Sequence, residues 1–236
     1  MKPLKLLRIF SIFITFTFLF THYAHASGAK RPDVTSPAQD VTDSSDIQGR
    51  IPPAGDSFSE SPVLEKYSYL DPDHSVPSAL LKKALEYFEA NQSKISNKRY
   101  IVIIDFSQHN SRKRFYLIDM ESGDVIGYLT AHGKNSDPDF DGYATQFSNV
   151  PDSLMSSVGF YLTAETYYGE HGYSLRLDGL SSTNSNARAR AIVIHGADYV
   201  TDAKLIGRSY GCPALDQRYY ADVINMIKSG ALIYAQ

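Results

Sequence analysis

The chain has 236 residues, a net charge of −3, 17 Tyr, 12 Phe, no Trp and a single Cys. Proteins that bind nucleic acid through charge carry a basic patch, and this balance offers none, so we expect no nucleic-acid partner. The many aromatic residues are typical of a β-rich interior or groove. About residues 63–236 remain after two N-terminal segments, which is enough for one domain with a hydrophobic core.

Residues 1–26 have the features of an export signal peptide. Basic residues within the first eight positions precede the apolar run Ile9–Phe20, and Ala24-His25-Ala26 fits a cleavage site of small residues. The run is shorter than the roughly 20 apolar residues of a membrane-spanning helix. We therefore expect an exported protein of the periplasm or cell envelope. The alternative is an uncleaved signal segment that serves as a transient membrane tether.

Residues 27–62 predict a disordered linker, because they contain no Leu or Tyr and are rich in Ser, Asp and Pro. Such a segment buries too little apolar surface to offset the entropy of ordering. Residues 63–98 predict an N-terminal extension with one helix, which Ser75 or Ser78 could cap. The apolar positions at helical spacing are Leu80, Leu81, Ala84, Leu85 and Phe88.

Residues 99–236 predict a β-rich domain, because runs of β-branched and aromatic residues alternate there with turn residues. The predicted strands are Tyr100–Phe106, Arg114–Met120, Asp124–Thr130, Phe160–Thr163, Ser174–Leu177, Ala191–Ile194 and Leu232–Ala235. Glu121-Ser122-Gly123 predicts a hairpin turn between the second and third strands. A helix over 220–227, closed by Gly230, precedes the last strand. We expect a mainly β fold with flanking helices rather than alternating βαβ units.

Cys212, the only cysteine, lies in the glycine- and proline-containing segment Gly207–Pro213. One cysteine cannot form an intramolecular disulfide, even in an exported protein. A free thiol in a loop is a candidate nucleophile. The alternative is a small buried core residue, since free cysteine is among the most buried residue types.

Three histidines are each followed by glycine and are candidates for the base that activates Cys212. His195 is favoured because it follows the apolar run Ile192-Val193-Ile194 and therefore ends a rigid strand, 17 residues before Cys212. His132 also ends a predicted strand and stays an alternative. We expect replacement of His171 to have little effect. A weaker alternative is a zinc ion held by Cys212 and two or three of these histidines.

The segment from Asp137 to Gly142 has the D-x-D-x-D-G pattern that begins a calcium-binding loop. The twelfth position of such a loop would be Ser148 instead of Glu, and no helical pattern precedes the segment. An acidic, solvated loop is therefore the favoured interpretation, with calcium binding as the alternative.

His195-Gly196 and the later Ser209-Tyr210-Gly211-Cys212 resemble the signature of the YkuD-like L,D-transpeptidases of peptidoglycan, a His followed by Ser/Thr-His-Gly-Cys. Tyr210 stands where the family commonly has a second His. The site loop resembles the branch of the family that carries Gly-Arg-Ser-x-Gly-Cys-Pro-Ala. The resemblance covers residues 99–236. It also includes Ala131-His132-Gly133-Lys134, Phe147-Ser148-Asn149, the run Ser156–Tyr161, and Tyr167-Tyr168-Gly169.

This resemblance implies a β-sandwich or barrel-like catalytic domain and a cysteine acyltransferase that needs no cofactor or metal. Cys212 would attack the carbonyl between the third residue of a peptidoglycan stem peptide and D-Ala, giving a thioester. An amine of a neighbouring stem peptide would then complete a 3→3 cross-link, whereas water as acceptor would give L,D-carboxypeptidase activity. His195 would act as base and then as acid, with its tautomer oriented by the Gly196 carbonyl.

Residues beside Cys212 fit the same chemistry. The N–H groups of Gly211 and Cys212 could form an oxyanion hole, and arginines could bind the carboxylates of stem peptides. The expected substrate-binding residues are Ser209, Tyr210, Arg208, Arg190 and His132. The departure at Tyr210 leaves a further alternative, a catalytically degenerate module that binds the cell wall.

Overall fold

The computed structural model describes residues 61–202 and 205–236. The predicted export signal at residues 1–26 and almost all of the predicted linker at residues 27–62 lie outside the described residues. Within that part of the chain, no helix is both long and apolar enough to cross a membrane. The last position of the predicted linker, Pro62, already belongs to a short helix.

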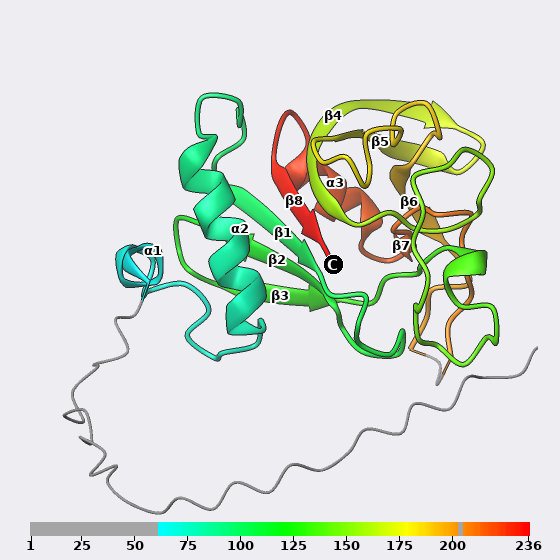
Figure 1. Ribbon diagram of the computed structural model, residues 1–236, viewed down its shortest axis with the longest axis horizontal. Helices are drawn as coiled ribbons and strands as arrows, with labels where there is room; N and C mark the ends of the chain where they lie inside the picture. Colours follow the sequence, from blue (N-terminus) through cyan, green and yellow to red (C-terminus); the bar gives the residue numbers. More distant parts are fainter. Residues whose placement is uncertain (1–60, 203–204) are drawn as a thin grey trace, which may run out of the picture. The chain divides into compact units, whose positions relative to one another are not determined.

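Eight strands of the described chain form one sheet in the order β3-β2-β1-β8-β4-β5-β6-β7 (Figure 1). The elements are α1 (Pro62–Lys66), α2 (Ser78–Ala90), β1 (Tyr100–Ile104), β2 (Phe115–Asp119), β3 (Val125–Tyr128), the short 3-10 helix η1 (Lys134–Ser136), β4 (Gly159–Gly169), β5 (Gly172–Gly179), β6 (Val193–Ala197), β7 (Leu215–Asp216), α3 (Tyr220–Ile227) and β8 (Leu232–Ala235). β1 is parallel to β8 and β6 is parallel to β7, while the other neighbours are antiparallel.

The two ends of this strand order meet. Thr130, shortly after β3, forms an isolated antiparallel bridge with Leu215 of β7. The sheet therefore curls into a nearly closed barrel, which leaves few unpaired strand edges. This confirms the expected mainly β, barrel-like fold with flanking helices.

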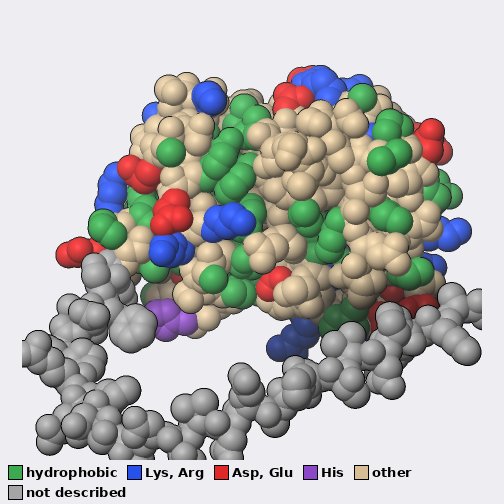
Figure 2. Space-filling view, in the orientation of Figure 1, with side chains coloured by type: hydrophobic (Ala, Val, Ile, Leu, Met, Phe, Trp, Pro, Cys, Tyr) green, Lys and Arg blue, Asp and Glu red, His purple; other side chains and the backbone are tan. Residues whose placement is uncertain are grey.

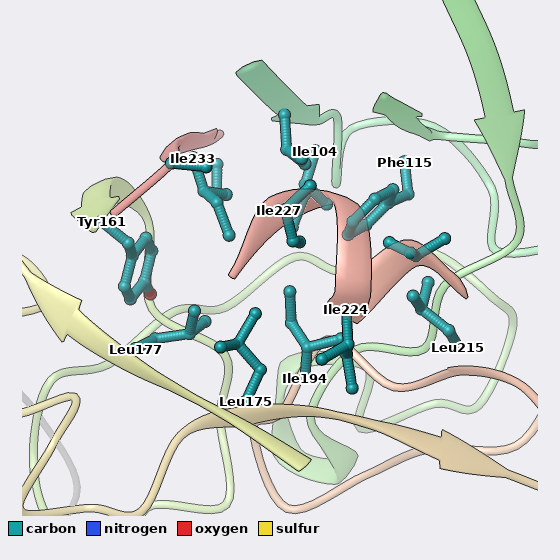
Figure 3. Close-up of a cluster of buried hydrophobic side chains, with 14 of the residues drawn as sticks. Ile104, Phe115, Tyr161, Leu175, Leu177, Ile194, Leu215, Ile224, Ile227 and Ile233 are labelled. Carbon is teal, nitrogen blue, oxygen red and sulfur yellow. The ribbon is translucent and has the colours of Figure 1, made fainter. Parts of the chain in front are cut away.

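β1 is buried on both faces because a hydrophobic cluster lies on each side of it. Ile101 and Ile103 belong to the cluster that α2 covers, and Val102 and Ile104 belong to the cluster that α3 fills. Alternate residues of a strand point to opposite faces, so the run of four apolar residues serves both clusters. Figure 3 shows the cluster that contains Val102 and Ile104, with α3 lying among the strands.

Helix α2 contains all five predicted apolar positions, and all five are buried. The predicted serine cap was wrong, because the N-cap is Pro77 and no side chain caps the helix. Instead, the carboxylate of Asp71 accepts hydrogen bonds from the backbone N–H groups of Ser75 and Val76, both at 2.8 Å. The helix shares its cluster with residues of β1 and β8, so the N-terminal extension and the β-rich region have one continuous core.

The predicted hairpin between β2 and β3 is confirmed, with Gly123 at φ +87° in its turn. β4 and β5 are both longer than the predicted strands, and they pair as a hairpin with a bulge between Thr163 and Thr166. β6 begins at Val193, two residues later than predicted, and the two-residue β7 was not predicted. On the face shown in Figure 2, Lys and Arg side chains lie among Asp and Glu and form no continuous basic surface.

Candidate active site

Cys212 lies in a tight loop that hydrogen bonds hold from two sides. The Ser209 N–H donates to the His132 carbonyl at 2.8 Å, and the Ser209 carbonyl accepts the N–H of Lys134 at 2.7 Å. Within the loop, Ser209 Oγ accepts the Gly211 N–H at 3.1 Å and donates to the Cys212 carbonyl at 2.7 Å. The backbone on both sides of the thiol is therefore fixed before any ligand arrives.

Gly211 is required by the shape of this loop. Its φ is +124°, which L side chains rarely adopt. A Cβ added there would lie 2.7 Å from the Met155 carbonyl oxygen, closer than carbon and oxygen approach without bonding. The packing against Met155 therefore gives a reason internal to the fold for glycine at this position.

Cys212 is a partly exposed residue, and its thiol points toward Ala191, two residues before β6. Its Sγ lies 3.7 Å from the carbonyl oxygen of Ala191, to which the S–H can donate. Burial raises the pKa of the thiol, while a backbone hydrogen bond from Val193 and the charge of Arg190 oppose that rise. The thiol is therefore protonated at neutral pH and needs a base to react.

β6 carries His195 two residues beyond Val193, or about 7 Å along the strand. His195 Nδ1 lies 2.9 Å from the Gly196 carbonyl oxygen. A carbonyl only accepts, so we assign the proton to Nδ1, which leaves the lone pair of Nε2 free. Burial lowers the pKa of His195, so the imidazole is neutral at neutral pH and able to accept a proton. Among the described residues, no hydrogen bond joins His195 to Cys212.

A second histidine covers the first. The ring of His171 stacks on that of His195, with centroids 4.3 Å apart and planes inclined by 19°. Both rings line a cavity of about 420 Å³, together with Asp198, Tyr199 and Tyr220. His171 is exposed, whereas His195 is only 2% exposed.

His132 does not lie at a surface that a ligand could reach. It is fully buried, with Nδ1 2.8 Å from Arg114 Nη2 and Nε2 3.2 Å from Asp137 Oδ2. Burial and the nearby charge of Arg114 lower the pKa of His132 to about 4. The neutral ring accepts from Arg114 and donates to Asp137. His132 thus belongs to a buried network beneath the site loop, and the expectation that it binds substrate needs correction.

The two candidate arginines hold loops around the thiol. Arg190 donates to the carbonyls of Ser148 at 2.7 Å and Met155 at 2.6 Å. Arg208 donates to the carbonyl of Asp137. Both nitrogens at the end of the Arg190 side chain are engaged. Among the described residues, Arg208 donates through Nη1 alone, so its other N–H groups can still bind a carboxylate. Arg190 acts on Cys212 through its charge, which lowers the pKa of the thiol.

Only one of the two predicted oxyanion donors is available in this conformation. The Gly211 N–H is engaged by Ser209 Oγ. The Cys212 N–H has no acceptor among residues 61–202 and 205–236. Tyr210 is 72% exposed beside it, where its hydroxyl can meet a ligand.

The described residues contain no cluster of side chains that would support the zinc or calcium alternatives. Asp137 is buried, and its carboxylate accepts the backbone N–H groups of Asp141 at 3.0 Å and Gly142 at 3.1 Å. That carboxylate closes its own loop instead of facing outward. Nowhere in the described part of the chain do three or more His, Cys, Asp or Glu side chains come together as a metal site.

Sequence reasoning missed the partners that make this site. Arg114 is fully buried, yet it follows basic residues in the sequence and resembles a surface position. Asp137 was expected in an acidic, solvated loop, with calcium binding as the alternative, yet its side chain is buried. Ala191, which accepts from the thiol, has φ +53°, and no local pattern predicts that conformation for alanine.

The family model for the L,D-transpeptidase catalytic domain matches residues 72–236 of the chain. Among solved structures, an L,D-transpeptidase from Mycobacterium smegmatis is 14% identical with a TM-score of 0.37, over 58% of each chain. L,D-transpeptidase 3 from Mycobacterium tuberculosis is 14% identical with a TM-score of 0.38, over 58% of this chain and 61% of that one. A helical cell shape determining protein from Campylobacter jejuni is 14% identical with a TM-score of 0.37, over 60% and 49%.

The chain thus spans less than two thirds of the length of these three proteins. No curated protein matches it. The family match, which extends from the segment before α2 to the last residue, carries the assignment.

Proposed function

Because the chain belongs to the L,D-transpeptidase catalytic-domain family, we propose that it is a cysteine L,D-transpeptidase that joins peptidoglycan stem peptides by 3→3 cross-links. One observation carries the proposal. The sole cysteine, Cys212, contacts the Ala191 carbonyl two residues before the strand that carries His195, and Nδ1 of that histidine is hydrogen-bonded to the Gly196 carbonyl. A protonated thiol and a neutral imidazole with a free Nε2 are the two partners that nucleophilic catalysis by cysteine requires.

In the acylation step, Nε2 of His195 removes the proton from Sγ, and the thiolate attacks the carbonyl carbon between the third residue and D-Ala. The oxyanion that forms accepts a hydrogen bond from the Cys212 N–H. The C–N bond then breaks, and the imidazolium returns its proton to the amine of the departing D-Ala. The product is a thioester between Cys212 and the stem peptide.

In the second step, an amine of a neighbouring stem peptide attacks the thioester carbonyl. His195 accepts the proton from that amine and delivers it to the departing Sγ, so the thiol is restored and an amide is formed. With water as the attacking group, the same sequence releases a shortened stem peptide, which is L,D-carboxypeptidase activity. The exposed Tyr210 contacts the peptide at the entrance to the site.

Catalysis requires the thiol to turn. In the resting site Sγ faces Ala191, so it must exchange that 3.7 Å contact for Nε2 of His195. Because S–H is a weak hydrogen-bond donor, breaking its contact with the Ala191 carbonyl costs little free energy. Engagement of the Gly211 N–H by Ser209 likewise leaves the oxyanion with one donor until the loop adjusts.

The test is incubation of the purified protein with a disaccharide tetrapeptide, followed by mass spectrometry of the products. We expect a dimer that has lost one D-Ala, and no turnover by Cys212→Ala. The matched control is His74→Ala, which changes an exposed histidine in the turn before α2. Retained turnover by Cys212→Ala would refute the cysteine mechanism.

A second candidate is a degenerate module that binds the cell wall without turnover, and the occupied Gly211 donor favours it. A carbapenem distinguishes the two candidates, because its strained ring carbonyl acylates an accessible thiolate. An adduct on Cys212 without tetrapeptide turnover supports the module. An adduct together with turnover supports the enzyme, and no adduct in a folded, reduced sample contradicts both an open thiol and the enzyme.

A further inference from the structure

The turn between β4 and β5 delivers an aromatic ring to the candidate base. Gly169 pairs with Gly172, so only Glu170 and His171 form the turn. Gly172 has φ +72°, which lets the chain reverse tightly. From this turn His171 reaches the imidazole of His195 and lies nearly flat on it, at 4.3 Å between centroids.

The register of the sheet explains why His171 contacts His195. Ser174 of β5 pairs directly with His195 of β6. Three residues before Ser174, the chain turns back over that pair and places His171 on the solvent side of His195. The buried ring thus has the sheet beneath it and one exposed ring above it.

We propose that His171 is a positioning residue that fixes the plane of the His195 imidazole. The stacked contact revises the expectation from the sequence that replacement of His171 has little effect. The bond from Nδ1 to Gly196 restrains one edge of the ring but leaves it free to pivot about that edge. A second ring stacked on its face removes this freedom, so Nε2 stays directed at one position. The inference rests on the proposed role of His195 as the base.

The stacking also bears on the imidazolium that forms during catalysis. When His195 takes the thiol proton, the charged ring faces the ring of His171. A charge on His171 would oppose this and lower the pKa of His195, whereas a neutral His171 ring presents its π-system to the imidazolium. Other ionisable groups around the same cavity are Glu170, Asp198, Tyr199 and Tyr220. An uncharged aromatic ring in place of His171 therefore suffices for the positioning role.

The experiment compares His171→Ala and His171→Phe in the tetrapeptide assay and in alkylation of Cys212 by iodoacetamide. One aromatic pair corresponds to a roughly 3- to 10-fold effect on rate. We expect His171→Ala to lower kcat by that factor with KM nearly unchanged, and His171→Phe to restore most of it. The alkylation rate at neutral pH should follow the same order. Because the effect of one aromatic pair on stability is small, the thermal unfolding temperature should fall by only a few degrees in His171→Ala and should recover in His171→Phe.

Three outcomes overturn the inference: unchanged kcat in His171→Ala, failure of the Phe variant to restore kcat, or a change in KM alone. His195→Ala and Cys212→Ala are measured beside them, with His74→Ala as the control. If His195→Ala keeps full activity, the proposed function itself is wrong. If His195→Ala and Cys212→Ala are inactive while His171→Ala has normal activity, only the positioning role of His171 is wrong.

Discussion

Replacement of Gly211 by alanine should show how much the shape of the site loop contributes to the stability of the protein. The new Cβ would sit 2.7 Å from the Met155 carbonyl oxygen and 3.0 Å from the side chain of Ile192. The oxygen cannot retreat easily, because it accepts a hydrogen bond from Arg190 at 2.6 Å. Relief of the clash therefore breaks that bond or distorts the loop.

The backbone strain at φ +124° costs up to about 3 kcal/mol. Loss of one hydrogen bond to a charged group adds about 1.5 kcal/mol, so we expect a loss of up to about 4.5 kcal/mol in total. With an m value of about 2 kcal/mol/M, the urea midpoint should fall by about 2 M. Because the chain has no Trp, unfolding is followed by far-UV circular dichroism and Tyr fluorescence.

Gly172→Ala is the matched control for this experiment. Gly172 also has positive φ, at +72°, but the nearest atom to an added Cβ is the Tyr220 hydroxyl at 3.9 Å. The free energy of unfolding of this variant should fall by only about 1 kcal/mol, which is the cost of alanine in a left-handed conformation. Equal losses for the two variants would show that the contact with Met155 has no role and that the reasoning is wrong.

Four further predictions concern the site and the linker. His132→Asn should lower stability by about 3 kcal/mol because it leaves buried charges without their partner, and a shift in the unfolding temperature no larger than that of a surface mutation would contradict this. Since burial lowers the pKa of His195 below its usual 6.5 and only the neutral ring is a base, turnover should persist through pH 6.5 and fall on further acidification; a fall beginning above that pH would refute the assignment. Arg190→Ala should raise the pKa of the Cys212 thiol and slow its alkylation at neutral pH, while Arg190→Lys keeps part of the effect, as a pH series of alkylation rates would show. Limited proteolysis should remove residues 27–62 and leave an active fragment, and a trimmed protein without activity would show that this segment contributes to the site.

Local sequence patterns determined the elements whose signals lie within a few residues. The five apolar positions of α2, the hairpin at Gly123 and the two-sided burial of β1 all follow from the spacing of apolar residues and from turn chemistry. Cys212 in a glycine-containing loop and His195 on an apolar strand are local signals of the same kind. The prediction that His195 ends this strand was wrong, because β6 continues to Ala197. The Gly196 carbonyl contact was expected from family resemblance, and its geometry is present at 2.9 Å.

Contacts between distant segments were decided by the tertiary structure alone. Three histidines share the same His-Gly context, yet their environments differ. His132 is buried between Arg114 and Asp137. His171 is exposed, and His195 is buried beneath it. Their environments depend on strand register, such as the pairing of Ser174 with His195, and on turns that reverse the chain. Spacing along a chain reports which residues share a face, but it does not report which face of another strand they meet.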